Sequence, residues 1–238
     1  MNIVTKLMRK GLKLEYCGAV IVAAGTASRM GGIDKVMAEL DGEPMICRTV
    51  RTFQNCDAIK EIVIVTREDL IPKMKMLFRE FPKVHSIVAG GASRDESVRL
   101  GLAALSKKVK LAAIQDGARP LVTEEVIDRT VRAAHSYGAA ASGVPMKDTV
   151  KEVEGGLVKQ TPDRSKLQAV QTPQVFDIDL LKAALQKAKE DGAAITDDCS
   201  AVERLGMKVR MVEGDERNIK VTTPMDLKIA TMLLEEMK

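Results

Sequence analysis

Short apolar runs alternate with longer segments of helical periodicity along most of the chain. The apolar runs are rich in Val, Ile and Ala, and each has the length of a buried β-strand. They cover residues 19–24, 61–66, 84–89, 111–115 and 139–144. Helical patterns lie between them, over residues 44–54, 69–79, 93–105 and about 123–138. This alternation predicts a doubly wound α/β fold, in which helices cover a mostly parallel sheet.

The ends of several predicted helices carry capping residues. Residues 93–96 read Ser-Arg-Asp-Glu, which is the pattern of a capping box. The helix that begins near Thr123 has two glutamates in its first turn and ends near Gly138. Thr223 and Pro224 supply an N-cap and a first-turn proline for a closing helix that runs to the end of the chain.

The strand-helix rhythm breaks after Pro145. Residues 149–153 and 157–161 flank Glu-Gly-Gly and predict a β-hairpin, so we expect a protruding arm over about 145–166. The regular pattern then resumes with two helices, 179–189 and a shorter one after Asp197, and with two strands, 209–212 and 219–221. We expect one domain over residues 19–238, preceded by an N-terminal extension over residues 1–18.

Composition excludes several classes of ligand. Of the 238 residues, 45% are hydrophobic and 29% are charged, which is ordinary for a globular domain. The net charge of +4 is small, and no dense Lys/Arg run resembles a nucleic-acid-binding arm. Aromatic residues make up only 3%, so platforms for base stacking are scarce. We therefore expect a small anionic ligand and no nucleic acid.

The cysteines and the N-terminal region indicate the cellular compartment of the protein. None of the four cysteines forms a CxxC pair, which argues against a zinc knuckle or a redox dithiol and suits a cytoplasmic protein. The basic residues between Lys6 and Lys13 precede an apolar run and imitate a secretory signal, but Glu15 interrupts them. We interpret the run as a buried strand. No apolar stretch reaches the roughly 20 residues that span a bilayer, so we expect no membrane partner.

The loop after the first strand, from Gly25 onward, is the first candidate for chemistry. A small-residue turn at a strand end can point backbone N–H groups at anionic oxygens. A P-loop is excluded because no Gly-Lys pair follows at its spacing, and Ala27 and Met30 replace two glycines of the dinucleotide pattern. Arg29 and Lys35 add two cations, which suits a triphosphate. The alternative is a plain turn with surface cations.

Seven short motifs occur in the order seen in one protein family. They are Ala23-Ala24-Gly25-x-x-x-Arg29-Met30 with Lys35, Gly90-Gly91-x-x-Arg94-x-x-Ser97, Asp116-x-Ala118-Arg119-Pro120, Asp148-Thr149, Gln171-Thr172-Pro173-Gln174, Thr196-Asp197 and Asn218-Ile219-Lys220-Val221-Thr222. From about Ala19 onward the chain resembles the 2-C-methyl-D-erythritol 4-phosphate cytidylyltransferases of non-mevalonate isoprenoid biosynthesis. The resemblance implies a Rossmann-like nucleotidyltransferase fold and a homodimer. It also implies joining of CTP to the polyol phosphate, release of pyrophosphate, and Mg²⁺ carried with CTP.

This chemistry is consistent with the residue types present. The attacking group is a phosphate oxygen of the acceptor, which is ionised at neutral pH because its second pKa is about 6. No general base is needed, and the two histidines, His85 and His135, fall in a predicted strand and helix where we expect structural roles. The transition state needs cations around the phosphorus and the leaving pyrophosphate. By resemblance, Arg29 and Lys35 supply them.

The resemblance also divides the other site residues between nucleotide and acceptor. Residues implied to bind CTP are Ala23, Ala24, Gly25, Gly90, Gly91 and Ser97. Residues implied to bind the acceptor are Asp116, Arg119, Thr149, Thr172 and Thr196, with Lys220 and Arg164 holding its phosphate. In the family, the counterparts of Thr149 and Arg164 come from the arm of the neighbouring subunit.

Each assignment has a structural alternative. Gly90 and Gly91 fit a capped turn, Asp116 and Arg119 fit a salt bridge, and Arg164 fits a solvated hairpin. Asp116 could also help to retain magnesium, although no metal ligand is assigned. We interpret Asp197 and Asp198, at the start of a helix, as N-cap residues.

The chain departs from the family pattern at three positions. It has Ala27 where the family has a second glycine, Asp34 where a proline precedes the lysine, and Ala92 where an acid or serine is common. An acid beside Lys35 weakens the field on the phosphates, so we expect a weaker hold on CTP. The rival functions are a ribitol 5-phosphate cytidylyltransferase and a non-catalytic nucleotide-binding regulator. The form of residues 116–120 and 161–164 is closer to the isoprenoid enzymes.

Overall fold

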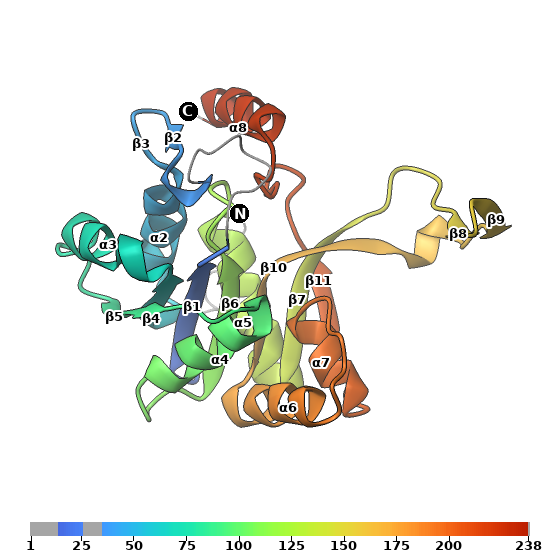
Figure 1. Ribbon diagram of the computed structural model, residues 1–238, viewed down its shortest axis with the longest axis horizontal. Helices are drawn as coiled ribbons and strands as arrows, with labels where there is room; N and C mark the ends of the chain where they lie inside the picture. Colours follow the sequence, from blue (N-terminus) through green and yellow to red (C-terminus); the bar gives the residue numbers. More distant parts are fainter. Residues whose placement is uncertain (1–13, 26–34, 238) are drawn as a thin grey trace, which may run out of the picture.

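The protein folds around a seven-stranded sheet in the order β11-β7-β10-β6-β1-β4-β5 (Figure 1). The computed structural model describes residues 14–25 and 35–237. The strands of the sheet are β1 (Cys17–Ala23), β4 (Ile59–Thr66), β5 (Val84–Ala89), β6 (Leu111–Asp116), β7 (Ala139–Pro145), β10 (Gln168–Asp177) and β11 (Arg210–Glu213). All neighbouring pairs are parallel except those of β10, which runs antiparallel to both β6 and β7. The predicted α/β fold with a mostly parallel sheet is confirmed.

Helices cover both faces of the sheet. On one face lie α2 (Met45–Asn55), α3 (Ile71–Leu77) and α5 (Glu124–Tyr137), and on the other lie α4 (Arg94–Ala104), α6 (Ile178–Glu190) and α7 (Asp198–Arg204). Successive residues of a strand point to opposite faces, so Ile21 of β1 joins the first core while its neighbour Val20 joins the second. The strand therefore sits between two apolar layers.

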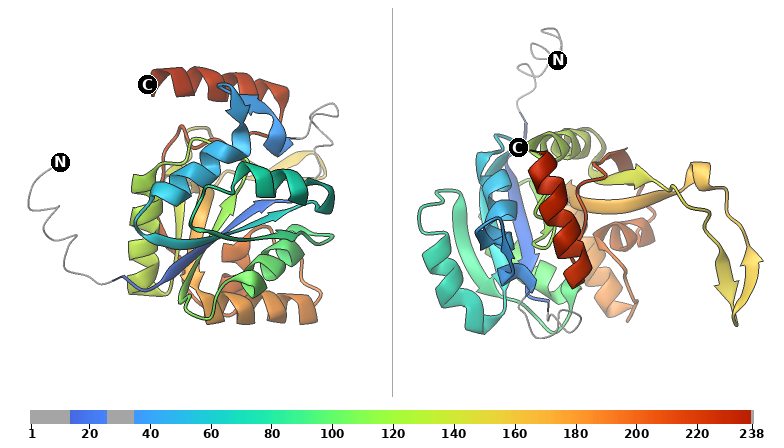
Figure 2. Two further views of the ribbon diagram at one scale, coloured as in Figure 1. Left: turned by 90° about the vertical axis from the view of Figure 1, so that its left-hand side faces the viewer. Right: turned by 90° about the horizontal axis from the view of Figure 1, so that it is seen from above.

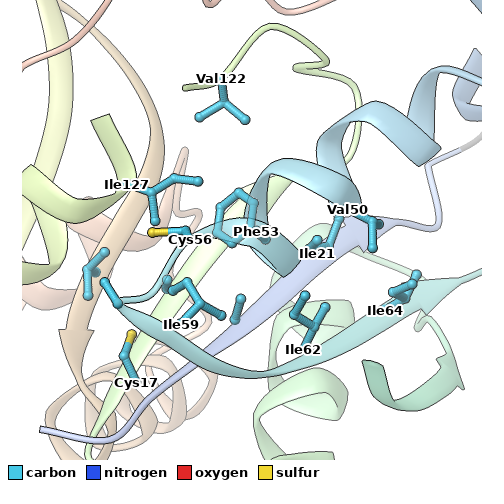
Figure 3. Close-up of a cluster of buried hydrophobic side chains, with 14 of the residues drawn as sticks. Cys17, Ile21, Val50, Phe53, Cys56, Ile59, Ile62, Ile64, Val122 and Ile127 are labelled. Carbon is cyan, nitrogen blue, oxygen red and sulfur yellow. The ribbon is translucent and has the colours of Figure 1, made fainter. Parts of the chain in front are cut away.

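Phe53 lies at the centre of the first core (Figure 3). Its ring is fully buried, and it projects from α2 among isoleucines of β1 and β4 and Ile127 of α5. The amphipathic sequence of α2 places Val50 and Phe53 on the same face, three residues apart. This packing fixes α2 against the sheet.

A third, smaller core holds the C-terminal helix α8 (Pro224–Glu236) over the short strands β2 (Glu39–Leu40) and β3 (Glu43–Pro44). The predicted cap is present, because the Thr223 hydroxyl accepts from the amide of Asp226 and the Asp226 carboxylate accepts from the amide of Thr223. Figure 1 shows α8 beside β2 and β3, away from the helices that cover the sheet.

The predicted hairpin forms a protruding arm. Strands β8 (Glu152–Glu154) and β9 (Leu157–Gln160) pair with each other and stand far from the sheet in Figure 1 and in the right-hand view of Figure 2. The one-turn helix η3 (Arg164–Lys166) leads the chain back into β10. The arm therefore grows out of two neighbouring strands, β7 and β10.

Three sequence predictions were wrong in detail. Strand β10 was missed because Pro173, whose peptide bond to Thr172 is cis, interrupts its apolar pattern and lies where its register shifts. Residues 219–221 form no strand; a backbone bond from Val221 N to Ala118 O, at 2.9 Å, ties them to the loop after β6. The predicted helix 69–79 is shorter, since a 3-10 turn, η2 (Glu68–Leu70), precedes α3.

All four cysteines are buried and unpaired. Burial raises the pKa of Cys56 to about 11, which keeps this thiol protonated at neutral pH. Within the described residues, no helix is long and apolar enough to cross a membrane.

We predict that Phe53→Ala lowers the free energy of unfolding by about 3–5 kcal/mol, because it removes a fully buried ring from a close-packed core. Denaturant unfolding measures this change. Met76→Ala is the control, since Met76 is 76% exposed on α3 and its loss should cost little. Equal stability of the two variants would contradict this account of the core.

Candidate active site

A pocket of about 580 Å³ opens at the carboxyl ends of the parallel strands. This is where open α/β sheets bind ligands, because the loops that leave neighbouring strands diverge there. The lining comes from the ends of β1, β4, β5 and β6, from the start of α4, and from the segment before α8. The lining residues are Val22, Ala23, Ala24, Gly25, Val36, Arg67, Glu68, Gly90, Gly91, Ala92, Ser93, Arg94, Ser97, Asp116, Ala118 and Lys220.

One end of the pocket is built from backbone and small side chains. Gly90 approaches β1 so closely that a Cβ there would lie 2.3 Å from the Cβ of Ala24 and 2.9 Å from the Oγ of Ser97. The Ser97 hydroxyl accepts a hydrogen bond from the amide of Gly91 at 3.1 Å and donates one to the carbonyl of Ser93 at 2.9 Å. This end therefore has a fixed shape, in which a flat ring can approach the backbone.

The start of α4 is only partly the predicted capping box. The Ser93 hydroxyl accepts from the amide of Glu96 at 3.2 Å, as expected. The Glu96 carboxylate, however, accepts from the amide of Ala92 at 2.8 Å, so the reciprocal bond to Ser93 is replaced. This bond folds the turn after Gly91 back onto the helix and fixes one wall of the pocket.

The other end of the pocket is charged and centres on Asp116, the last residue of β6. Its carboxylate lies 2.7 Å from Lys220 Nζ, 3.7 Å from Arg119 Nε and 3.7 Å from Arg94 Nε. Its side chain is only 10% exposed. Burial alone would raise the pKa of Asp116, but Lys220, Arg94 and Arg119 lower it below the usual value. Asp116 is therefore an anion at neutral pH.

Arg119 and Thr172 are held by the same local network. Arg119 donates through Nη1 to the carbonyl of Asn218 at 2.6 Å, and the Asn218 side-chain amide donates to the carbonyl of Thr172 at 2.9 Å. The Thr172 hydroxyl accepts from the backbone amide of Asp116 at 3.1 Å. These bonds join β6, β10 and the segment that carries Lys220, which explains why residues 219–221 need no strand pairing to be positioned.

The two acids at the start of α7 have different roles. Asp197 is the N-cap, accepting from the amide of Ser200 at 3.0 Å in a capping box. Asp198 is fully buried and accepts from Arg94 Nη2 at 2.8 Å. The prediction that both are capping residues is therefore right for Asp197 and wrong for Asp198, because the latter turns inward to a partner on α4.

Most of the residues predicted for the nucleotide and the acceptor lie together. Those that line the pocket's small-residue end are Ala23, Ala24, Gly25, Gly90, Gly91 and Ser97. Those gathered around its charged end are Asp116, Arg119, Thr172 and Lys220. Arg29, Ala27 and Asp34 lie outside the described residues. Lys35 begins the 3-10 turn η1 (Lys35–Met37), and its side chain is also outside the described part.

Five of the predicted residues whose side chains lie in the described part of the chain do not line the pocket. Arg119 and Thr172 belong to the network around Asp116, whereas the other three, Thr149, Arg164 and Thr196, form no bond to that network among the described residues. Thr149 and Arg164 belong to the arm and are exposed, and Arg164 donates through Nη1 to the carbonyl of Lys147 at 2.7 Å. Thr196 is exposed before α7, where its backbone amide donates to the Ser200 hydroxyl at 3.2 Å. Within one chain, then, Arg164 stands apart from the acceptor end that it was predicted to serve.

Four residues that shape the site were not predicted as site residues, although Arg94 belongs to one of the quoted motifs and Asp198 was interpreted as an N-cap. Arg67 and Glu68, after β4, line the pocket together with Arg94. Arg94 forms an ion pair with Asp198, whose fully buried side chain lies behind the lining. One signal was available for Arg94. A cation in the first turn of a helix faces the positive end of the helix dipole, so it needs a carboxylate partner elsewhere.

The cations of the charged end differ in how exposed they are, which decides how each could meet an anion. Lys220 is 40% exposed, so it can turn from Asp116 to an incoming phosphate, whereas the Arg119 side chain is only 11% exposed. No histidine lines the described pocket: His85 and His135 lie in β5 and α5, as predicted. The arrangement suits a reaction that needs cations rather than a general base.

Comparisons with known proteins place this chain in one family. The family model for 2-C-methyl-D-erythritol 4-phosphate cytidylyltransferase matches residues 17–236. The protein of that name from Caldanaerobacter subterraneus is 44% identical over 223 residues, with 92% of this chain and 98% of that protein covered. The one from Symbiobacterium thermophilum is 45% identical over 219 residues, covering 91% and 92%.

Solved structures agree as well. The crystal structure of 4-diphosphocytidyl-2C-methyl-D-erythritol synthase from Anaerococcus prevotii superposes with a TM-score of 0.85 at 32% identity, covering 93% of this chain and 96% of that one. The 2-C-methyl-D-erythritol 4-phosphate cytidylyltransferase from Thermus thermophilus gives 0.76 at 29% identity, covering 93% and 100%. The chain belongs to the 2-C-methyl-D-erythritol 4-phosphate cytidylyltransferase family.

Proposed function

We propose that this enzyme joins CTP to 2-C-methyl-D-erythritol 4-phosphate, giving the CDP-polyol and pyrophosphate. The observation that carries the proposal is the division of one pocket into a small-residue end and a charged end. The first suits the base of CTP, through Gly90, Gly91 and Ser97. The second, around Asp116 and Lys220, suits a phosphorylated polyol.

The proposed reaction is an in-line transfer at the α-phosphorus of CTP. An oxygen of the acceptor's phosphate forms a bond to the α-phosphorus. The bond between the α-phosphorus and the oxygen that bridges it to the β-phosphate breaks, and pyrophosphate leaves with that oxygen. Arg29 and Lys35 follow the strand end that carries Ala23, Ala24 and Gly25, and we assign them to the charge that develops on the pyrophosphate. Lys220 binds the attacking phosphate.

The acceptor's hydroxyls are assigned to the groups around Asp116. An ionised carboxylate accepts hydrogen bonds from hydroxyls, and Asp116 is ionised because three cations surround it. Arg119 contributes positive charge beside it, while Thr172 fixes its backbone. Thr196 precedes α7, the helix whose Asp198 reaches Arg94, and is assigned to the outer edge of the acceptor site.

Magnesium fits this site as an ion carried with CTP. Among the described residues, no three His, Cys, Asp or Glu side chains cluster as a metal site. Asp116 already faces three cations, which makes it a poor separate ligand. Magnesium is commonly held by substrate phosphates together with one or two carboxylates and water, so the triphosphate would supply ligands that the protein does not. Bound there, it would neutralise phosphate charge.

We further propose a cytoplasmic homodimer in which the arm completes the neighbour's site. Arg164 and Thr149 lie on the arm, and neither is among the residues that line the described pocket of their own chain. The arm also exposes apolar side chains that a monomer leaves in water: Val153, Leu157 and Val158 are 56%, 77% and 58% exposed. A second copy would cover them and deliver Arg164 to meet Lys220.

The function is tested by pyrophosphate release with CTP and each of two acceptors. We expect release with 2-C-methyl-D-erythritol 4-phosphate and little or none with ribitol 5-phosphate. Activity on ribitol phosphate alone would reassign the acceptor. Absence of release with both, from folded protein that binds CTP, would favour a non-catalytic nucleotide-binding regulator.

The nucleotide end is tested by Gly90→Ala. The new methyl would overlap the Cβ of Ala24 at 2.3 Å, so the backbone at this end must shift. We predict that the KM for CTP rises roughly tenfold, which corresponds to about 1.4 kcal/mol of lost binding. Combining Gly90→Ala with Ala24→Gly removes the closest clash and should recover part of the loss. An unchanged KM in the single variant would place the base elsewhere.

The arm is tested by mixing two inactive variants. Co-expression of Arg164→Ala with Lys220→Ala gives mixed dimers in which one site carries both changes and the other carries neither. We predict that each variant alone is nearly inactive and that the mixture recovers activity in about a quarter of its sites. Failure of purified mixed dimers to regain activity would show that Arg164 does not serve the neighbouring site.

A further inference from the structure

Arg94 joins two carboxylates that belong to different elements. Its Nη2 donates to Asp198 of α7 at 2.8 Å, while its Nε lies 3.7 Å from Asp116 at the end of β6. A guanidinium is planar and rigid, so a bond that fixes Nη2 also fixes the position of Nε beside it. Asp198 therefore controls where Arg94 faces Asp116, although Asp198 itself does not line the pocket.

Asp198 has little freedom to move. Its side chain is fully buried, and Arg94 provides its only side-chain hydrogen bond among the described residues. A buried carboxylate that loses its partner is strongly destabilised, so the pair stays closed. Burial alone would lower the pKa of Arg94, but Asp198 and Asp116 raise it above its usual value. The cation is thus permanent.

The two kinds of cation around Asp116 differ in how firmly they are held. Lys220 makes the closest contact, at 2.7 Å, yet its side chain is 40% exposed. Arg94 is anchored by Asp198, and Arg119 is anchored by the carbonyl of Asn218. If Lys220 moves to the acceptor's phosphate, Asp116 loses its nearest cation and depends on the two anchored arginines to keep its position.

We infer that Asp198 is a positioning residue, which acts through Arg94 to hold Asp116 in place while Lys220 binds the acceptor's phosphate. The inference rests on the proposed function, because it needs an acceptor whose phosphate draws Lys220 away and whose hydroxyls meet Asp116. A purely structural pair would join α4 to α7 without affecting the acceptor. Only the positioning role predicts a change in the KM for the acceptor.

The first test is Asp198→Asn, which keeps the shape of the side chain and removes its charge. Because Asp116 meets the acceptor, the KM for 2-C-methyl-D-erythritol 4-phosphate should rise about tenfold or more, while the KM for CTP stays within about twofold. Asp191→Asn is the matched control. It breaks exposed ion pairs with Lys187 and Arg204, so both constants should stay at wild-type values.

The second test removes both charges with Arg94→Met and Asp198→Leu in one chain. Replacing both partners of a buried pair by apolar residues spares stability, whereas removing one partner does not. Asp116 keeps Arg119 and Lys220 in this double variant, so we expect it to fold and still to show the raised acceptor KM.

Three results would overturn the inference. The first is an unchanged acceptor KM in folded Asp198→Asn, and the second is a wild-type acceptor KM in the double variant. The third is loss of the fold in both variants, which would show that the Arg94–Asp198 pair serves the core alone. Wild-type protein that releases no pyrophosphate with this acceptor would instead remove the proposed function, and the inference with it.

Discussion

One anion at the end of β6 organises the functional half of this protein. Asp116 is nearly buried, and a carboxylate in that position stays charged only if cations replace the water it has lost. Three elements supply them: α4 provides Arg94, the turn after β6 provides Arg119, and the segment before α8 provides Lys220. The need to surround the Asp116 carboxylate with cations therefore ties these three segments together at this edge of the sheet.

The same cations are what a phosphoryl transfer needs. Groups that stabilise a transition state work best when they are held in place before the reaction begins. Lys220 Nζ lies 2.7 Å from the Asp116 carboxylate, so the lysine is held in place by an ion pair at the charged end of the pocket. Under the proposed function, the acceptor's phosphate competes with this carboxylate for Lys220, and Arg94 and Arg119 remain to stabilise Asp116 afterwards.

The sequence predicted the sheet well where strands are apolar and bounded by turns. The bounds of β5 match the predicted residues 84–89, and Thr223 caps α8 as expected. Strand β10 was not predicted because the polar stretch around Pro173 shows no alternation of apolar and polar residues. The neighbouring strands nevertheless bury this stretch.

The site was predicted by motif order more than by local physics. That order identified Asp116 and Lys220, but it could not show that they contact each other. Asp198 was misassigned because a local cap explains an acid at a helix start, while its true partner, Arg94, lies 104 residues earlier. Pairings of this kind depend on how α4 and α7 meet in the fold, and one sequence does not contain that information.

The most direct test of the central claim is a crystal structure with CTP and 2-C-methyl-D-erythritol 4-phosphate bound together. The account predicts that Lys220 Nζ contacts the acceptor's phosphate and has left Asp116, while Arg94 still bridges Asp116 and Asp198. A complex in which Lys220 remains on Asp116 and other groups hold the phosphate would contradict it.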